Sequence, residues 1–446
     1  MPIERPSGGV AGVSGVIGPG ARVPRVVWGF VRRFWSGSCH ESAKIIFGAV
    51  LLAVLAFALW RGVAPRSSPG VEEGRAGMGL EVSPDDVPRR VPTLAGRVFP
   101  ANCAEDRLVR ALLGSPPSVP LDGAAACHFL RAYGLGPIPN SALQSGRLTA
   151  LAMLDGDRAK QLFGKPLFYQ TRYGVRSTLA LPDRTPGKTG AGEAHRDQCL
   201  AAFAEAGLPL STPIRTSSGV FSIRAVLDDS VLNFKPDEEE IHWTAIAYCL
   251  YLPAQTAWRN RDGERFGFDD LANELMRRPL GEASCGGAHL LYALTLLLRV
   301  DREAPRLSQP VRQAVEQRLR KWVATAMGSQ AADGWWALDW FQPGALPPSI
   351  ANFPLYRLIA TGHIVEWMQY LPEDLQPAQA VYVRAAGWLH SELRKMMTGS
   401  FEASQFCAWT HSVCAIRNLL LGFRSDASVS ESIGIGPSSQ RGHRGS

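Results

Sequence analysis

A chain of 446 residues can bury at least one large core, and its 46% hydrophobic and 20% charged residues are the proportions of an ordinary globular protein. The net charge of +7 does not indicate a nucleic-acid partner, because Lys and Arg are dispersed among Asp and Glu with no basic run of five or more. Eight cysteines without a Cys-x-x-Cys pair argue against a disulfide scaffold, a zinc ribbon or a thioredoxin motif. Cys103 and Cys127 could bridge in an oxidising compartment, although isolated buried thiols are the simpler expectation.

Three segments precede the expected globular part. Residues 1–43 are rich in Gly, Pro, Val and Arg without a helical or strand period, which predicts a disordered basic tail. Residues 44–61 contain the uncharged run Ile45–Trp60 between two basic residues, which predicts a transmembrane anchor, with a cleaved signal sequence as the alternative. Residues 62–100 hold six prolines and predict a linker. We therefore expect a single-pass membrane protein whose body lies on the extracytoplasmic side.

Residues 101–239 combine short helical and extended patterns and predict a small mixed α/β segment. Two short amphipathic patterns and a longer one closed by Gly207 indicate helices, whereas two stretches rich in β-forming residues indicate strands. The predicted helices are Glu105–Leu113, Cys127–Tyr133 and His195–Gly207, and the predicted strands are Leu167–Tyr173 and Val220–Leu227.

Residues 240–422 predict a succession of helices, and residues 423–446, which lack an apolar period, predict a disordered tail. Helices that are apolar on every side, as at Leu290–Leu298, alternate with helices that have one apolar stripe, as at Val311–Trp322. Because a helix that is apolar all round must be covered all round, the pattern predicts an inner ring inside an outer ring, a double-layered helical barrel. The predicted helices are Glu240–Leu252, Phe268–Arg278, Cys285–Arg299, Gln309–Met327, Phe353–Leu371, Ala378–Met397 and Ser404–Leu421.

Four histidines near the starts of inner helices support the same arrangement. His242, His289, His363 and His411 are separated by 47, 74 and 48 residues. A helical hairpin with its loops takes roughly 40 to 47 residues in repeat proteins, so the first and last separations match one hairpin each. The longer middle separation contains the additional segment 328–350. We therefore expect the four imidazoles to meet at one cavity.

The segment Gln330-Ala-Ala-Asp-Gly-Trp-Trp336 has the Gln-x-x-x-Gly-x-Trp spacing of the repeat in squalene and hopene cyclases. With the alternating helices, residues 240–422 resemble the α/α toroid of terpenoid cyclases and protein prenyltransferase catalytic subunits. The resemblance implies a mainly α, toroid-like domain. The catalytic motifs of these families are not matched: neither Asp228-Asp229 nor Asp269-Asp270 completes the Asp-x-Asp-Asp motif, and Asp197-Gln198-Cys199, which has the shape of a prenyltransferase zinc pair, precedes the toroid-like region.

Cys285 and His289 are the candidate metal ligands. They are four residues apart, so they share one face of a helix, and a thiolate and an imidazole are good ligands for zinc, the cofactor we consider. Gly286-Gly287 between them permits a bent helix start. The alternative is a tight turn with a buried thiol and a hydrogen-bonded core imidazole.

His363 and Glu366 are the candidate catalytic residues, since a carboxylate three residues from an imidazole on a helix can raise its basicity for acid–base chemistry. The alternative is one buried ion pair.

The remaining candidates are pocket residues, because aromatic walls with a few polar groups are typical of small-molecule sites. The alternative is that the tryptophans fill a wide barrel. The candidate pocket residues are His242, Trp243, Trp367, Trp409 and His411.

The sequence therefore predicts a membrane-anchored protein whose central pocket binds a small molecule or a metal and could be an active site. The alternative is a non-catalytic scaffold or peptide-binding module with a packed centre. No nucleic-acid partner is expected, and the sequence does not indicate an oligomeric state.

Overall fold

The computed structural model describes residues 79–91, 93, 122–135, 146–180, 196–351, 353–398 and 405–420. Contacts divide the chain into two compact units, Met1–Gly74 and Arg75–Ser446, and every described residue belongs to the second. Within these ranges, 61% of the residues are helical, in 13 helices, beside a few small sheets. The mainly helical class predicted from the sequence is confirmed at this level.

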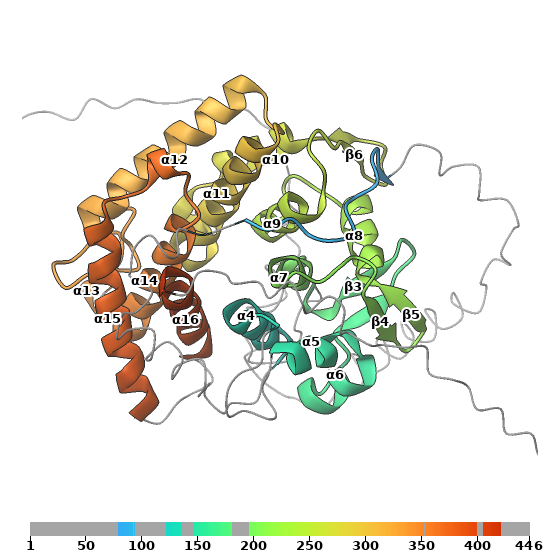
Figure 1. Cartoon of the computed structure of the whole chain (residues 1–446), viewed down its shortest axis with the longest axis horizontal. Coiled ribbons are helices and arrows are strands. Elements are labelled where there is room, and N and C mark those ends of the chain that lie inside the picture. The colour runs from blue at the N-terminus through green and yellow to red at the C-terminus, as the bar shows by residue number, and fades with distance from the viewer. Residues whose placement is uncertain are drawn as a thin grey trace, which may run out of the picture. The chain divides into compact units, whose positions relative to one another are not determined.

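Six helices pack in a circuit in which each contacts the next and the last contacts the first (Figure 1). They come from the whole length of the described chain, so the circuit closes between segments that are far apart in sequence. In order they are α4 (Gly123–Tyr133), α7 (Gln198–Ala206), α9 (Ile241–Tyr251), α11 (Ala288–Glu303), α14 (Pro354–Met368) and α16 (Phe406–Leu420).

The helices of the circuit are buried on most sides because their sequences carry few charges. All eleven residues of α9 are buried, and so is the whole of Leu290–Leu298 in α11. Burying a Leu or Ile side chain stabilises a fold by about 1.5 to 3 kcal/mol relative to leaving it in water. The expectation that these helices are covered all round is therefore met by neighbours within the circuit and by helices outside it.

Outer helices lie against the circuit and bury one stripe each. In α12 (Gln309–Ser329) the buried residues Val315, Leu319, Val323 and Ala326 recur every three or four positions, and charged residues lie between them. The outer helices are α5 (Gly146–Leu154) on α4, α8 (Ile223–Leu232) on α7, α10 (Phe268–Arg277) on α9 and α11, α12 on α11, and α15 (Gln379–Thr398) on α14 and α16, with α6 (Gly156–Phe163) on α5 and the short α13 (Pro348–Ala351) on α14.

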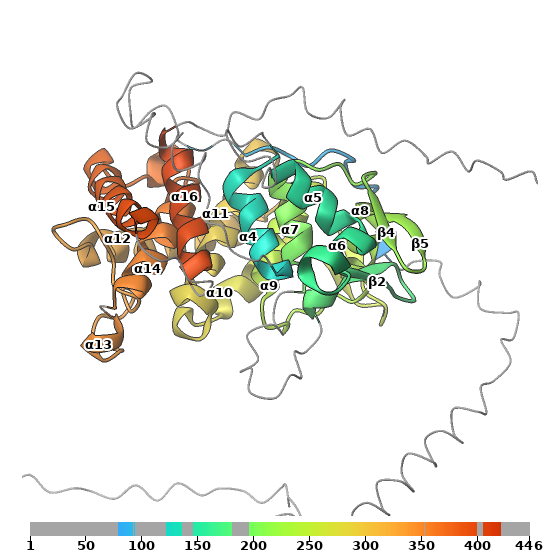
Figure 2. The ribbon, with the colours of Figure 1, turned by 90° about the horizontal axis from the view of Figure 1, so that it is seen from below.

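Three small antiparallel sheets complete the described chain. One has the order β1-β6-β7, and two are hairpins, β2 with β3 and β4 with β5. Figure 2 shows the β4–β5 hairpin beside α6 and α8, which it contacts. The strands are β1 (Gly79–Leu80), β2 (Phe168–Gln170), β3 (Val175–Ser177), β4 (Pro213–Thr216), β5 (Gly219–Ser222), β6 (Trp258–Arg259) and β7 (Arg265–Phe266).

One predicted strand is wrong beyond its first residues. Val220–Leu227 was expected to be extended, but β5 ends at Ser222 and α8 begins at Ile223. The helix buries Val226, Leu227 and Val231 on one face. Helical spacing of these apolar side chains therefore outweighs their preference for strands. The predicted strand Leu167–Tyr173 contains β2, and the predicted helix Glu105–Leu113 lies outside the described residues.

Two features of the predicted domain organisation differ from the described packing. The expected boundary at 239/240 falls within one compact unit, since α4 and α7 belong to the same circuit as the helices after residue 240. Part of the expected linker also packs: β1 pairs with β6, and the backbone of Arg89 donates a 2.7 Å hydrogen bond to Leu250. The expected tails 1–43 and 423–446 lie outside the described residues.

The predicted single-pass membrane protein is contradicted. Among the helices in the described ranges, none combines the length and the apolar composition needed to cross a bilayer. A crossing needs about 20 predominantly apolar residues; the apolar α11 has 16 residues, and the 21-residue α12 carries a charged face. The expected anchor at residues 44–61 lies outside the described residues.

Candidate metal centre

The turn before α11 places Cys285. Cys285 and Gly286 have left-handed backbones, with φ of 54° and 61°, and Gly287 follows with φ of 76°. A Cβ on Gly286 would lie 2.9 Å from the carbonyl oxygen of Leu338, and one on Gly287 would lie 2.5 Å from Leu280. Only glycine fits these two positions. The left-handed backbone of Cys285 costs about 1 kcal/mol or more, because this residue has a side chain. Since these three residues are not helical, the predicted helix Cys285–Arg299 begins only at Ala288.

Five imidazoles from five helices of the circuit form a continuous group. The ring centroids of His242 and His289 lie 5.3 Å apart, and His289 lies 4.8 Å from His363. His363 stacks on His411 at 3.6 Å, and His411 lies 4.9 Å from His128. The four histidines expected from the sequence to meet do lie together, each at most 4% exposed.

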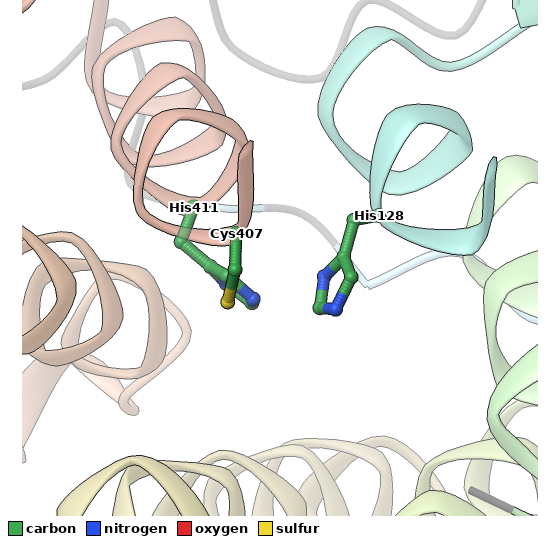
Figure 3. Close-up of side chains that lie close together, drawn as sticks. All are labelled: His128, Cys407 and His411. Atoms are coloured by element: carbon green, nitrogen blue, oxygen red, sulfur yellow. The ribbon is translucent and has the colours of Figure 1, made fainter. Parts of the chain in front are cut away.

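Two sets of metal-donor side chains occur within this group, each with two histidines and one cysteine. One set is Cys285, His289 and His363; the other is His128, Cys407 and His411, whose side chains point into the space between α4 and α16 (Figure 3). Within each set the donor atoms lie within 4.8 Å of one another. A tetrahedral zinc ion separates such donors by about 3.3 to 3.8 Å, so small side-chain movements would bring each set to bonding distance.

The Nδ1 atoms of two histidines already have hydrogen-bond partners. Nδ1 of His363 lies 2.7 Å from the carbonyl oxygen of Ile359, and Nδ1 of His411 lies 2.5 Å from a carboxylate oxygen of Glu366. Because both partners are acceptors, each Nδ1 carries the proton and each Nε2 presents a lone pair. In the described part of the chain, these two buried Nε2 atoms have no hydrogen-bond partner. A buried acceptor without a partner is costly, and a metal ion in each donor set would satisfy the Nε2 atom that belongs to that set.

Burial keeps the imidazoles in the form that binds metals. It lowers the pKa of His363 to about 4, with the nearby Glu366 acting in the opposite sense. Burial, reinforced by the neighbouring imidazoles, also lowers the pKa of His289 and of His411 well below the usual value. These rings are therefore neutral near pH 7.

The thiols of Cys285 and Cys407 contact each other, and this contact links the two donor sets. A hydrogen bond from Cys285 lowers the pKa of the Cys407 thiol, and the same contact together with burial raises the pKa of Cys285. The contact therefore favours the thiolate at Cys407, the form in which a cysteine binds a metal.

Glu366 belongs to a buried network rather than to a pair with His363. Its second oxygen accepts a 2.9 Å hydrogen bond from Arg131, whose Nε lies 2.5 Å from Glu205. Although burial opposes the charge, Glu205 and Glu366 raise the pKa of Arg131 well above its usual value. The expected His363–Glu366 pair is thus replaced by a chain from His411 through Glu366 to Arg131.

The three candidate tryptophans occupy different surroundings. Trp243 lies beside the ring of His289, with centroids 4.7 Å apart, and donates a 3.0 Å hydrogen bond to Glu240. Trp409 donates a 2.9 Å hydrogen bond to Tyr133, and Trp367 is fully buried. Of the three, the contact with a histidine ring places Trp243 in the wall of the centre.

Sequence reasoning missed His128, Arg131 and Cys407 as members of the centre. Cys407 had a detectable signal, because it precedes His411 by four residues, as Cys285 precedes His289. His128 and Arg131 had none, since they lie in a short helix far from the others in sequence.

No family model, curated protein or solved structure matches this chain.

Proposed function

We propose that this chain is a zinc metalloprotein whose metal centre lies inside an α/α toroid. The observation that carries the proposal is the pair of buried Nε2 atoms on His363 and His411, which lack partners among the described residues while their Nδ1 atoms are held by acceptors. This is the arrangement in which proteins present histidine to a metal.

The donor types support zinc over harder cations. Imidazole and thiolate are preferred by zinc and its neighbours in the first transition row, whereas magnesium and calcium prefer carboxylate and carbonyl oxygens. Each donor set has three protein ligands, and catalytic zinc sites keep three protein ligands and one position for water or substrate. The reaction class we propose is therefore hydrolysis of a small molecule at the metal.

The toroid proposal is supported by the closed circuit of six apolar helices and the one-sided helices outside it. The proposal is also supported by the continuous group of imidazoles, to which five helices of the circuit contribute one ring each. The ring provides the rigid elements that a metal centre needs to hold its ligands in position.

Metal analysis of the purified chain tests the proposal. After reconstitution with zinc and removal of free metal, we expect about one or two zinc ions per chain. Replacing one thiol donor, in Cys285→Ser or Cys407→Ser, should reduce the bound zinc. Cys249→Ser is the matched control, because Cys249 is a fully buried thiol of α9 that belongs to neither donor set.

The control should keep the full complement of zinc. Folding of each variant is checked by circular dichroism, so that loss of zinc is not confused with unfolding. Absence of bound metal in the folded wild-type chain would refute the proposal and favour the alternative of a non-catalytic scaffold with a packed centre. Equal zinc in wild type and in both donor variants would refute the ligand assignment.

A further inference from the structure

Two thiols outside the donor sets contact each other between α4 and α7. The sulfur atoms of Cys127 and Cys199 lie 3.1 Å apart, although the residues are 72 positions apart in the sequence. Both side chains are fully buried. A disulfide bond places its sulfurs about 2.05 Å apart, so about 1 Å of movement separates this contact from a covalent bond.

We propose that Cys127 and Cys199 form a disulfide bond that fastens α4 to α7. This inference does not depend on the metal centre. Neither thiol belongs to a donor set found within the described residues. The hydroxyl of Ser177 also lies 3.5 Å from the Cys199 sulfur, which is farther away than the sulfur of Cys127.

The position of the bond gives it a structural consequence. The same two helices are joined by a 3.3 Å contact between His128 and Gln198 and by the ion pair of Arg131 with Glu205. A covalent link at Cys127 would therefore hold the segment of α4 that carries His128 and Arg131. The bond also closes a long loop, and cross-links stabilise by restricting the unfolded chain.

The oxidation needs an electron acceptor, and a small-molecule disulfide such as oxidised glutathione serves. The Cys127 thiolate attacks the glutathione disulfide and releases one glutathione. The Cys199 thiolate then attacks the mixed disulfide and releases the second, so two thiols become one disulfide while one glutathione disulfide becomes two glutathiones. Because both sulfurs are buried in the finished fold, the exchange takes place during folding, before α4 and α7 come together.

Peptide mapping tests the proposal on the full-length chain. The chain is refolded either with a mixture of oxidised and reduced glutathione or with reduced glutathione alone, and its free thiols are blocked after unfolding. We expect a peptide that contains Cys127 joined to Cys199 only after oxidative refolding. We also expect the oxidised chain to melt about 5 °C or more above the reduced chain.

Cys199→Ala and the control Cys249→Ala complete the test. The first should lose both the joined peptide and the dependence of Tm on redox conditions, and the second should keep both. If Cys199→Ala does not fold, the peptide map of the wild-type chain decides alone. Two blocked thiols at 127 and 199 after oxidative refolding, or Cys127 joined to Cys103 instead, would overturn the proposal.

Discussion

His363 combines full burial with a polar ring, and its protonation state follows from that position. Its Nδ1 bonds the carbonyl oxygen of Ile359, and burial lowers its pKa to about 4. The ordinary histidine pKa is about 6.5, so between these values the unfolded chain binds a proton that the folded chain does not. Stability conferred by a group of this kind is present above pH 6.5 and is lost as pH falls toward 4.

A urea titration of the metal-free chain measures this effect. Between pH 7.5 and pH 5, His363 should reduce the free energy of unfolding by about 2 kcal/mol. Burial raises the pKa of Glu238 to about 7, and this acts in the opposite sense. The comparison is therefore between wild type and His363→Gln, which share Glu238. If both lose the same stability over this pH range, the neutral buried state of His363 is wrong.

Arg131 joins the buried carboxylate of Glu366 to the partly buried carboxylate of Glu205, so its removal should be costly. In Arg131→Met, Glu205 and Glu366 would lose their shared guanidinium. Breaking a buried pair costs about 3 to 5 kcal/mol, because an uncompensated charge stays buried. The control is Arg224→Ala, which removes a pair with Asp228 in which both side chains are 40% exposed. Exposed pairs contribute about 0.2 to 1 kcal/mol, and urea denaturation distinguishes the two effects.

At the scale of an element, the Ser284–Gly287 turn controls where the donors of α11 lie. The three left-handed residues place Cys285 ahead of the helix while His289 lies in its first turn. A regular helix start would have put both residues on one helical face, as the sequence alone predicted. The turn instead determines the position of the thiol independently of the helix.

Two glycines with the same backbone conformation test the importance of this turn. Gly287 and Gly164 both have φ of 76°, but a Cβ would collide with Leu280 at Gly287 and meets nothing within 4 Å at Gly164. Alanine at either position adds about 1 kcal/mol of backbone strain. Gly287→Ala should cost about 1 to 3 kcal/mol more, because of the collision, and should reduce zinc binding. Equal destabilisation in the two variants would mean that the turn adjusts to the added methyl group at Gly287 without a further energetic cost.

The observed helices and strands show which parts of the fold could be predicted from the sequence. The seven helices predicted after residue 240 were found within a few residues because most are long and periodic, as α12 is, whereas the four-residue α13 was not predicted. Val220–Leu227 failed because β-branched residues in a short helix look like a strand. The meeting of the histidines of α9, α11, α14 and α16 followed from their spacing. The spacing did not predict that α4 also contributes to the centre, because no local sequence pattern indicates that α4 contacts α16.

At the scale of the whole described unit, the contact between α4 and α16 closes the circuit of six helices. The side chain of Trp409 donates to the hydroxyl of Tyr133, 276 residues away, and Arg417 bonds the backbone of Ala132. Contacts over such separations carry no signal in a single sequence, whereas the loss of chain entropy on closing them is large. The closed circuit also implies that no helix of the ring is a free end, unlike the terminal repeats of an open solenoid.

Hydrogen exchange in two tryptophan variants tests this closure. Trp409 and Trp340 are both almost fully buried, so Trp409→Ala and Trp340→Ala should each cost about 3 to 5 kcal/mol. Trp409 lies at the contact between α16 and α4, whereas Trp340 packs against Trp322 and Phe341. At equal global stability, adjusted with urea, amides of α4 should exchange faster in Trp409→Ala than in Trp340→Ala, because local opening then begins where the ring closes. The same protection of α4 in both variants would show that α4 is held by α5 and α7 and that the contact with α16 contributes little.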